Sequence, residues 1–249
     1  MKKIVLITGA SSGIGEAIAR ELADSFALII CGRRIDKLEE LKTELSGTEV
    51  QILQFDVRRN KEVQAAINAL PEDWKKIDVL INNAGNAHGL NPIHEGDIAD
   101  WDAMIDSNLK GLLYVTRAIS PGMVQRKSGH IINISSIAGK QVYPGGNVYC
   151  ASKFAVGAAT DGIRLDLNPY NIKVTCINPG MVKTEFSTVR FKGDINRAEN
   201  VYKGVDPLVA KDIAEVVKFT VDRPAHVVLS DITIMPIAQA SAGVVNRKG

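Results

Sequence analysis

Three side chains in the second half of the chain have the types and spacing needed to move a proton near neutral pH. Tyr149 and Lys153 are four residues apart, which places both on one face of a helix. A free phenol has a pKa of about 10, but an ammonium about 4 Å away contributes about 4 kcal/mol, or roughly three pKa units. Lys153 is therefore expected to bring Tyr149 into the working range of a base. Ser136, just upstream, would donate to a substrate oxygen as charge develops there.

The elements that must position these residues alternate between short apolar runs and amphipathic stretches. The apolar runs predict strands at 4–7, 27–31, 50–55, 79–81, 130–134, 173–177 and 228–234. Helical periodicity between them predicts helices at 13–24, 36–45, 61–69, 101–126, 148–167 and 210–222. This alternation is typical of βαβ units, so we predict one α/β domain over residues 1–249, with a doubly wound parallel sheet and helices on both faces.

Two segments interrupt the alternation. Residues 184–206 are charged and irregular and follow a predicted strand, so they would lie at the carboxyl edge of the sheet as a substrate lid. We call them the lid segment. Residues 236–249, the C-terminal tail, are rich in small residues and lack helical periodicity. The tail either packs on a neighbouring subunit or is loose.

Composition argues against several classes of protein. The chain has 249 residues and a formal net charge of +2, which gives no electrostatic footprint for nucleic acid. No stretch approaches the roughly 18 apolar residues of a membrane-spanning helix, so no membrane partner is expected. The three cysteines are scattered without a CxxC pair, which favours buried thiols in a reducing cytoplasm over disulfides.

A glycine-rich loop, Thr8–Gly15, connects the first predicted strand to the first predicted helix. Its spacing is TGxxxGxG rather than GxGxxG. Glycines allow a tight turn and close approach to a pyrophosphate, and the helix N-terminus offers free N–H groups and a positive dipole. A purely structural turn is the alternative, but the position between strand and helix favours a nucleotide. The cofactor contacts expected here are Gly9, Ser11, Ser12, Gly13, Ile14 and Gly15.

The ends of the next three strands indicate which nucleotide is bound. The second strand ends in Arg33-Arg34, where NAD enzymes carry an acid for the ribose hydroxyls. Guanidinium groups suit a 2′-phosphate, so NADP is predicted. The alternative is that the two arginines are solvated residues at the start of the next helix. Asp56-Val57 would meet adenine and Asn82-Asn83-Ala84-Gly85 the ribose. Each of these two segments is equally consistent with a simple turn.

Taken in order, these motifs resemble the short-chain dehydrogenase/reductase superfamily over nearly the whole chain. They are Thr8–Gly15, Asn82–Gly85, Ser136, Tyr149 with Lys153, and Asn178-Pro179-Gly180. The resemblance implies a single Rossmann-type domain with a seven-stranded parallel sheet. It also implies a cytoplasmic dimer or, preferably, a homotetramer, and chemistry that needs no metal. The four histidines, none at ligand spacing, agree with the last point.

Within the superfamily the chain resembles the NADP-dependent 3-hydroxy acid dehydrogenases, including the serine and L-allo-threonine dehydrogenases. The segments that carry this are 31–34, 146–149, 184–187, 189–194 and 235–236. The resemblance implies that Tyr149 is the general acid/base and that Lys153 also bonds the nicotinamide ribose. Asn108 would hold a water chain to Lys153, unless it only kinks or caps a helix. The residues implied to hold the nicotinamide carboxamide are Pro179, Gly180, Val182 and Thr184.

A 3-hydroxy acid carries a carboxylate, so its pocket should contain a cation. Arg190 and Lys192 lie in the lid segment, and we expect one of them to bind the carboxylate. Ordinary solvated loop charges are the alternative. Gln141, Val142 and Met181 are expected to shape the rest of the pocket.

The sequence thus predicts an NADP-dependent oxidoreductase that reversibly oxidises the 3-hydroxyl of small acids such as serine, L-allo-threonine or 3-hydroxypropionate. A broad carbonyl reductase or a 3-oxoacyl-carrier reductase would use the same chemistry on another substrate. A non-catalytic NADP-sensing protein is the third possibility. The complete set of Ser136, Tyr149 and Lys153 argues against it.

Overall fold

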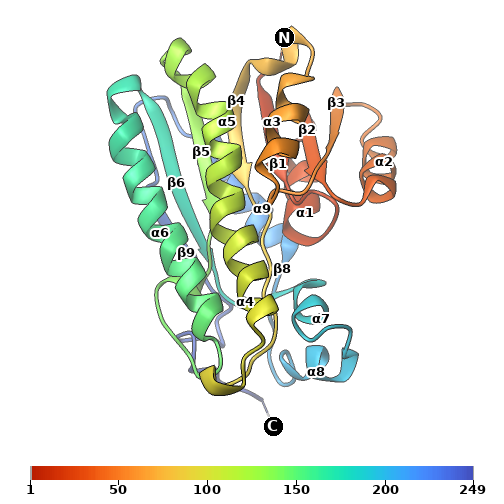
Figure 1. Ribbon diagram of the computed structural model, residues 1–249, viewed down its shortest axis with the longest axis vertical. Coiled ribbons are helices and arrows are strands. Elements are labelled where there is room, and N and C mark those ends of the chain that lie inside the picture. The colour runs from red at the N-terminus through yellow and green to blue at the C-terminus, as the bar shows by residue number, and fades with distance from the viewer. Residues whose placement is uncertain (1, 249) are drawn as a thin grey trace.

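Seven parallel strands form the central sheet of the computed structural model, which describes residues 2–248. Their order across the sheet is β3-β2-β1-β4-β5-β6-β9, as Figure 1 shows. The strands are β1 (Ile4–Thr8), β2 (Ala27–Gly32), β3 (Val50–Gln54), β4 (Ile77–Asn82), β5 (Gly129–Ile134), β6 (Ile172–Pro179) and β9 (Asp231–Ile234). The predicted seven-stranded, doubly wound parallel sheet is confirmed. The last strand is shorter than expected and begins at Asp231 rather than at residue 228.

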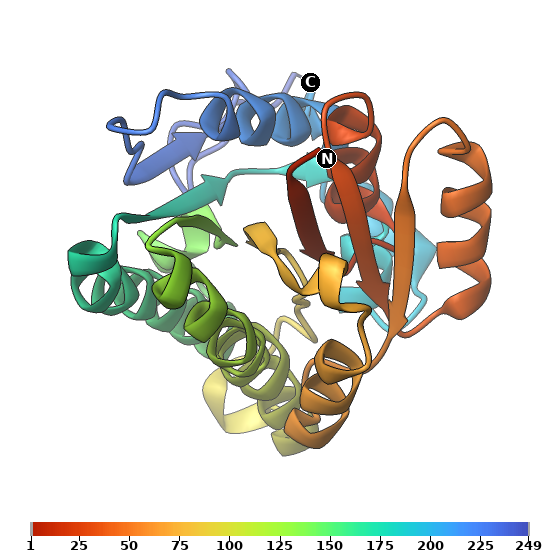
Figure 2. The same ribbon diagram turned by 90° about the horizontal axis from the view of Figure 1, so that it is seen from above.

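Helices cover both faces of the sheet because each central strand is apolar on both sides. In β1, Val5 and Ile7 pack into one core cluster, while Ile4 and Leu6 pack into the other. The first core is shared with α1 (Gly13–Leu22), α2 (Ile35–Glu44) and α9 (Ala210–Val221). The second is shared with α3 (Asn60–Asn68), α5 (Gly111–Arg126) and α6 (Asn147–Leu167). Figure 2, which looks from above, shows these two layers on opposite sides of the sheet.

The strand order reverses between β1 and β4, and this places the loops that follow the strands at one edge of the sheet. β1 pairs with β2 on one side, Thr8 opposite Cys31, and with β4 on the other, Ile7 opposite Ile81. Ligands of doubly wound sheets bind in the crevice outside the carboxyl ends at such a point. The glycine loop and the segments after β2 and β4 therefore meet there.

The helix predicted over residues 101–126 is present, but it contains a π-helical turn. It consists of α4 (Ile98–Ile105), a π-helical turn (Asp106–Lys110) and α5. Ser107 and Asn108 in the turn are buried and polar, and both side chains bond groups outside the helix. The extra residue of a π turn rotates such side chains toward their partners, which an amphipathic pattern does not reveal.

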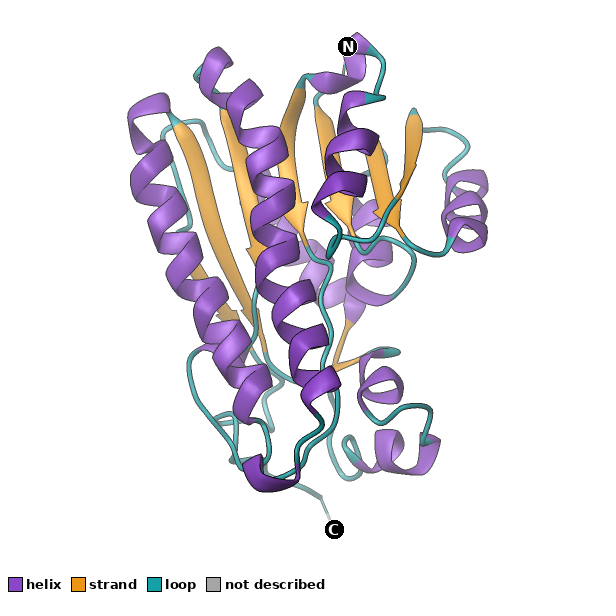
Figure 3. Ribbon diagram, viewed as in Figure 1, coloured by secondary structure: helices purple, strands orange, loops and turns teal. Residues whose placement is uncertain are grey.

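The lid segment is more regular than expected. It contains two short helices, α7 (Phe186–Arg190) and α8 (Ile195–Asn200), beside the main body (Figure 3). At its base, β7 (Val182–Lys183) pairs in parallel with β8 (Leu208–Val209). These two short strands join the beginning and end of the lid segment, so it leaves and re-enters the domain at one place.

The C-terminal tail, described as far as Lys248, packs on this same chain. Gln239 and Val245 form an isolated antiparallel β-bridge within the tail. The Arg247 guanidinium donates to the backbone oxygens of Val201 and Lys203 in the lid segment. Met1 and Gly249 lie outside the described residues. Among residues 2–248, no helix is long and apolar enough to cross a membrane.

Candidate active site

A cavity of about 630 Å³ runs along the carboxyl ends of the strands. The glycine loop and the ends of β2, β4, β5 and β6 form its floor, and the lid segment and C-terminal tail cover it. Such a volume is in the range of small-molecule and cofactor sites. Most of the residues singled out from the sequence line this one cavity, although they come from widely separated segments.

The glycine loop is hydrogen-bonded to the segment after β4. Gly9 has φ +68°, a conformation that side-chain-bearing residues rarely adopt. The Thr8 hydroxyl accepts from the backbone N–H groups of Asn83 and Ala84, both at 3.0 Å. Gly15 does not line the cavity, but a Cβ there would collide with the Gly9 carbonyl oxygen. Its role is close packing of the loop rather than ligand contact.

Three guanidinium groups surround the end of the cavity nearest β2 and β3. Arg33 and Arg34 follow β2 as predicted, and Arg58 adds a third cation that sequence reasoning missed. Within residues 2–248 the Arg33 guanidinium has no hydrogen bond or ion pair, so it is available to a ligand. Arg58 is paired instead with Asp56 at 2.6 Å. Burial alone would raise the pKa of Asp56, but the bonds from Arg58 outweigh it and lower that pKa.

Helix α6 buries Tyr149 and Lys153 on one face, as their spacing predicted. Tyr149 is 7% exposed and Lys153 5% exposed, and both line the cavity with Ser136. The Lys153 ammonium donates to the Ile134 carbonyl oxygen at 3.1 Å, which ties it to the end of β5. Ser136 lies two residues beyond the end of that strand, and its hydroxyl accepts from the Ala138 N–H at 3.1 Å. The three expected chemical groups therefore meet beside one another.

The prediction that Lys153 depresses the phenol pKa is wrong for this arrangement. Burial raises the pKa of Tyr149, because removal from water disfavours the phenolate. The groups that oppose this rise are the Ser136 hydroxyl, through a hydrogen bond, and the charged Arg190. Burial also lowers the pKa of Lys153 to about 8.

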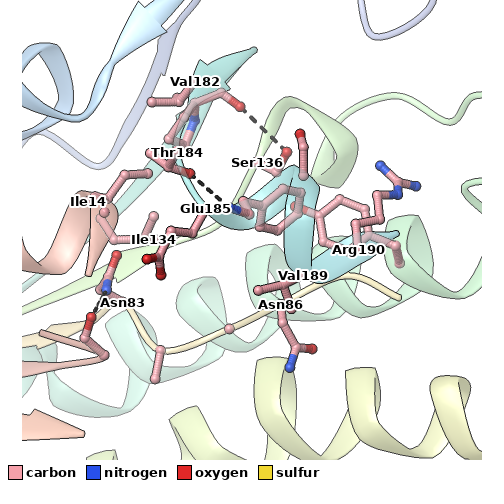
Figure 4. Close-up of a pocket in the computed structure, with 18 of the residues that line it drawn as sticks. Ile14, Asn83, Asn86, Ile134, Ser136, Val182, Thr184, Glu185, Val189 and Arg190 are labelled. Carbon is pink, nitrogen blue, oxygen red and sulfur yellow. Dashed lines mark hydrogen bonds between the residues drawn. The ribbon is translucent and has the colours of Figure 1, made fainter. Parts of the chain in front are cut away.

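Arg190 is fixed beside the phenol. Its guanidinium carbon lies 5.5 Å from the ring centroids of both Tyr143 and Tyr149. Its Nε donates to the Gly89 carbonyl oxygen at 3.0 Å, while its Nη2 is buried with no partner among the described residues. Figure 4 shows Arg190 and Ser136 around the same cavity. A buried, unpaired cationic N–H group is costly, and an anionic ligand would relieve that cost.

Asn108 does not line the cavity, but its side chain bonds the backbone of Asn86, which does. Its Oδ1 accepts from the Asn86 N–H at 2.8 Å, and its Nδ2 donates to the Asn86 carbonyl at 2.9 Å and to Ser152 at 3.0 Å. Gly85 passes so close that a Cβ would lie 2.9 Å from the Asn108 oxygen and 3.5 Å from the Lys153 ammonium. Asn108 thus holds the backbone after β4 against Lys153.

Val142, expected to shape the pocket, is exposed and does not line the cavity, and three polar site residues also lie outside the lining. Lys192 binds Asp100 at 3.0 Å and Asp97 at 3.4 Å instead of facing the pocket. Gln141 accepts from the Ala242 N–H at 2.8 Å in the C-terminal tail. The Asn82 side chain is buried between strands, where it donates to Thr116 at 3.0 Å and Asn133 at 2.9 Å. In each case a protein partner already uses the group that was expected to bind ligand.

Sequence reasoning also missed two residues of the substrate end. Tyr143 lines the cavity between Ser136 and α6, and its ring flanks Arg190. Gln239, 5% exposed, comes from the C-terminal tail, and its Oε1 accepts from the Met181 N–H at 2.8 Å. Tyr143 could have been proposed from the sequence, because it is an aromatic residue between Ser136 and Tyr149. Gln239 lies in no sequence motif that would have indicated a role in the site.

Comparison with known proteins assigns the chain to a family. Residues 3–194 match the family model described as short chain dehydrogenase. The chain belongs to the short-chain dehydrogenase family. It is therefore an oxidoreductase by family, and its cavity brings the glycine loop together with a buried tyrosine and lysine.

Relatives of this short-chain dehydrogenase match along the full length. It is 46% identical over 243 residues to the NADP-dependent 3-hydroxy acid dehydrogenase YdfG of Escherichia coli O6:H1, covering 97% of this chain and 98% of the relative. It is 44% identical over 251 residues to sulfoacetaldehyde reductase 2 of Chromohalobacter salexigens, covering 99% and 100%. The closed form of serine dehydrogenase complexed with NADP+ is 45% identical with a TM-score of 0.94, covering 99% of this chain and 100% of that one.

Proposed function

We propose that this short-chain dehydrogenase uses NADP and reversibly oxidises the 3-hydroxyl group of small 3-hydroxy acids. The observation that carries the proposal is the buried Nη2 of Arg190, which has no partner among residues 2–248 and is held beside the Tyr149 ring. An acid group bound there would lie only a few bonds from a hydroxyl at the phenol. Short acids of the serine, L-allo-threonine or 3-hydroxypropionate type have this separation between the two groups.

The residues of the cavity fit NADP. Gly9 packs against the segment after β4, where a Cβ would approach the Ala84 Cα to 2.9 Å, and the loop lines the cavity where a pyrophosphate would lie. The unpaired Arg33 and the neighbouring Arg34 suit a 2′-phosphate. Bound NADP supplies the acceptor for the hydride. Residues that line the cavity and would hold NADP are Gly9, Ser11, Ser12, Gly13, Ile14, Arg33, Arg34, Asp56, Val57, Asn83, Ala84, Gly85, Pro179, Gly180, Val182 and Thr184.

In the proposed mechanism the Tyr149 phenol oxygen exchanges a proton with the substrate hydroxyl. The Ser136 hydroxyl, which lines the same cavity, would hold the substrate oxygen as charge develops. Lys153 donates one N–H to Ile134, which leaves two N–H groups for the ribose and the phenol side of the site. Burial disfavours an isolated phenolate, so proton removal is favoured when cations flank the ring. Arg190 is such a cation.

The names of the relatives support an acidic substrate. A 3-hydroxy acid, serine and sulfoacetaldehyde each combine a small carbon skeleton with an acid group. This chain places the partly buried Arg190 guanidinium at the end of the cavity that contains Tyr149. A carbonyl reductase for neutral substrates, or a 3-oxoacyl-carrier reductase, would leave that charge unpaired, and a protein that only senses NADP would not need it.

A cytoplasmic homotetramer completes the proposal. Exposed apolar side chains on two neighbouring helices, Leu113 of α5 and Phe154 and Leu165 of α6, favour contact with further copies. Sedimentation of the purified chain would determine the number of subunits.

The experiment that tests the function is steady-state turnover with NADP or NAD against a panel of 3-hydroxy acids and neutral alcohols of equal length. We expect the highest kcat/KM for acids with NADP. Equal kcat/KM for acids and neutral alcohols would favour the carbonyl reductase. Tight NADP binding without turnover of any substrate would favour the sensing protein.

A further inference from the structure

The Arg34 side chain joins the cofactor cradle to the lid segment. Its Nη2 donates to the Ser11 carbonyl oxygen in the glycine loop at 3.0 Å and to the Glu185 carboxylate at 3.2 Å. Ser11 and Arg34 belong to the first 34 residues, whereas Glu185 is 151 positions further along the chain. The contact therefore spans the edge of the cavity from its floor to its cover.

Arg34 has spare donors for a ligand. A guanidinium carries five N–H groups, and both bonds use Nη2, so Nε and Nη1 have no partner among residues 2–248. One guanidinium can thus hold a phosphate with its free edge and still bond Ser11 and Glu185. The side chains of Arg34 and Glu185 are 44% and 60% exposed, so their pair alone contributes little. A bound phosphate would orient Arg34 and thereby strengthen its hold on Glu185.

From Glu185 the lid segment leads directly to the substrate end of the cavity. Glu185 immediately precedes α7, whose first residue, Phe186, packs its ring 5.7 Å from the Tyr149 ring centroid. The last residue of α7 is Arg190, which bears the unpaired Nη2. One turn of helix therefore separates the carboxylate that meets Arg34 from the cation proposed to bind substrate.

We propose that Glu185 is a positioning residue that couples the NADP 2′-phosphate at Arg34 to the placement of Phe186 and Arg190 around the substrate. This inference rests on the proposed function for the identity of the two ligands. It means that the 2′-phosphate improves binding of the acid as well as binding of the cofactor. Because coupling between sites is reciprocal, the acid in turn tightens NADP more than NAD.

The test compares the wild type with Glu185→Gln and with the control Glu199→Gln. Glu199 is an exposed lid-segment carboxylate with no ion pair among the described residues. KM for a 3-hydroxy acid is measured at saturating NADP and at saturating NAD. In the wild type and in Glu199→Gln, we expect KM to be lower with NADP by roughly 2- to 5-fold, the effect of one exposed ion pair. In Glu185→Gln the two values become equal, while kcat with NADP changes little.

A second measurement does not depend on turnover. Trypsin cleavage after Lys192 and Arg197, which lie in the lid segment, is followed with saturating NADP or NAD. We expect NADP to protect the wild type and Glu199→Gln more than NAD does, and the two cofactors to protect Glu185→Gln equally.

Each alternative outcome has a definite meaning. An unchanged KM ratio or unchanged protection in Glu185→Gln would overturn the inference and leave the proposed function intact. Tighter NADP binding by Glu185→Gln would show that Glu185 competes with the 2′-phosphate, which also overturns it. Absence of turnover with any acid would overturn the proposed function, and the proteolysis result would still decide the coupling between cofactor and lid segment.

Discussion

Arg190 stands over Tyr149, with its guanidinium carbon 5.5 Å from the phenol ring centroid and its Nη2 buried and unpaired. The same cation opposes the rise that burial causes in the pKa of Tyr149. One side chain of the lid segment therefore acts on the Tyr149 phenol and offers a site for an anion. The position of the lid segment therefore affects the pKa of Tyr149 on α6.

Replacing Arg190 with alanine should weaken the binding of acids selectively. A hydrogen bond to a charged group contributes about 1.5–3 kcal/mol, so KM for a 3-hydroxy acid should rise by roughly 10- to 100-fold. KM for a neutral alcohol of equal length should change much less. Lys192→Ala is the matched control, since Lys192 is held by Asp97 and Asp100 outside the cavity lining. Equal losses for acids and alcohols would contradict the assignment of Arg190.

Replacing Tyr149 with phenylalanine should remove the proton-transfer group and keep the ring packing. We expect kcat to fall by about 10²- to 10⁴-fold, the usual contribution of a general acid/base. NADP binding, measured by titration calorimetry, should change by no more than about twofold if the phenol acts mainly in the chemical step. Tyr170→Phe, at an exposed turn after α6, provides the control. A nearly normal kcat in Tyr149→Phe would rule out the proposed role.

Replacing Arg33 with aspartate should change the cofactor preference. The substitution removes an unpaired guanidinium and adds a carboxylate that repels a 2′-phosphate and accepts from ribose hydroxyls. We expect Kd for NADP to rise at least roughly 10-fold and Kd for NAD to fall. Arg59→Asp makes the same charge change at an exposed residue that pairs with Glu62 away from the cavity. If both variants weaken NADP equally, the effect is only long-range charge.

Buried His130 should make the fold sensitive to acid. Its Nε2 lies 2.9 Å from the Thr175 hydroxyl, its Nδ1 is buried without a partner among the described residues, and burial lowers its pKa from 6.5 to about 3. The unfolded chain takes up this proton below pH 6.5 and the folded chain does so only near pH 3. Over that window the free energy of unfolding should fall with decreasing pH, by about 1.4 kcal/mol per unit.

The measurement is urea unfolding of the wild type and His130→Gln between pH 7 and pH 4. The difference in unfolding free energy between the two proteins should shift in favour of the variant as the pH falls. His226→Gln, at an exposed position, should follow the wild type at every pH. A constant difference between wild type and His130→Gln would show that His130 is already charged in the fold or does not titrate.

Patterns local in sequence determined the architecture and half of the site. Runs such as Ile4–Thr8 are apolar at every position, and only a strand covered on both faces buries all of them. The four-residue interval between Tyr149 and Lys153 is a helical contact, so it needed no tertiary information. The glycine loop followed from its place between a strand and a helix. The π-helical turn at Asp106–Lys110 was not predictable in the same way, because it depends on buried partners elsewhere.

Only the tertiary structure decided between charges that are equivalent in sequence. Arg190 and Lys192 are two residues apart, yet α7 places the first against Tyr143 and Tyr149 and leaves the second to Asp100. The contact of Arg34 with Glu185, and the burial that governs the pKa of Tyr149, likewise arise from segments that meet only when the chain is folded. Residue type and local spacing determine what a side chain can do. Distance to groups far along the chain, and exclusion of water by them, determine whether its charge is paired, shifted or free for a ligand.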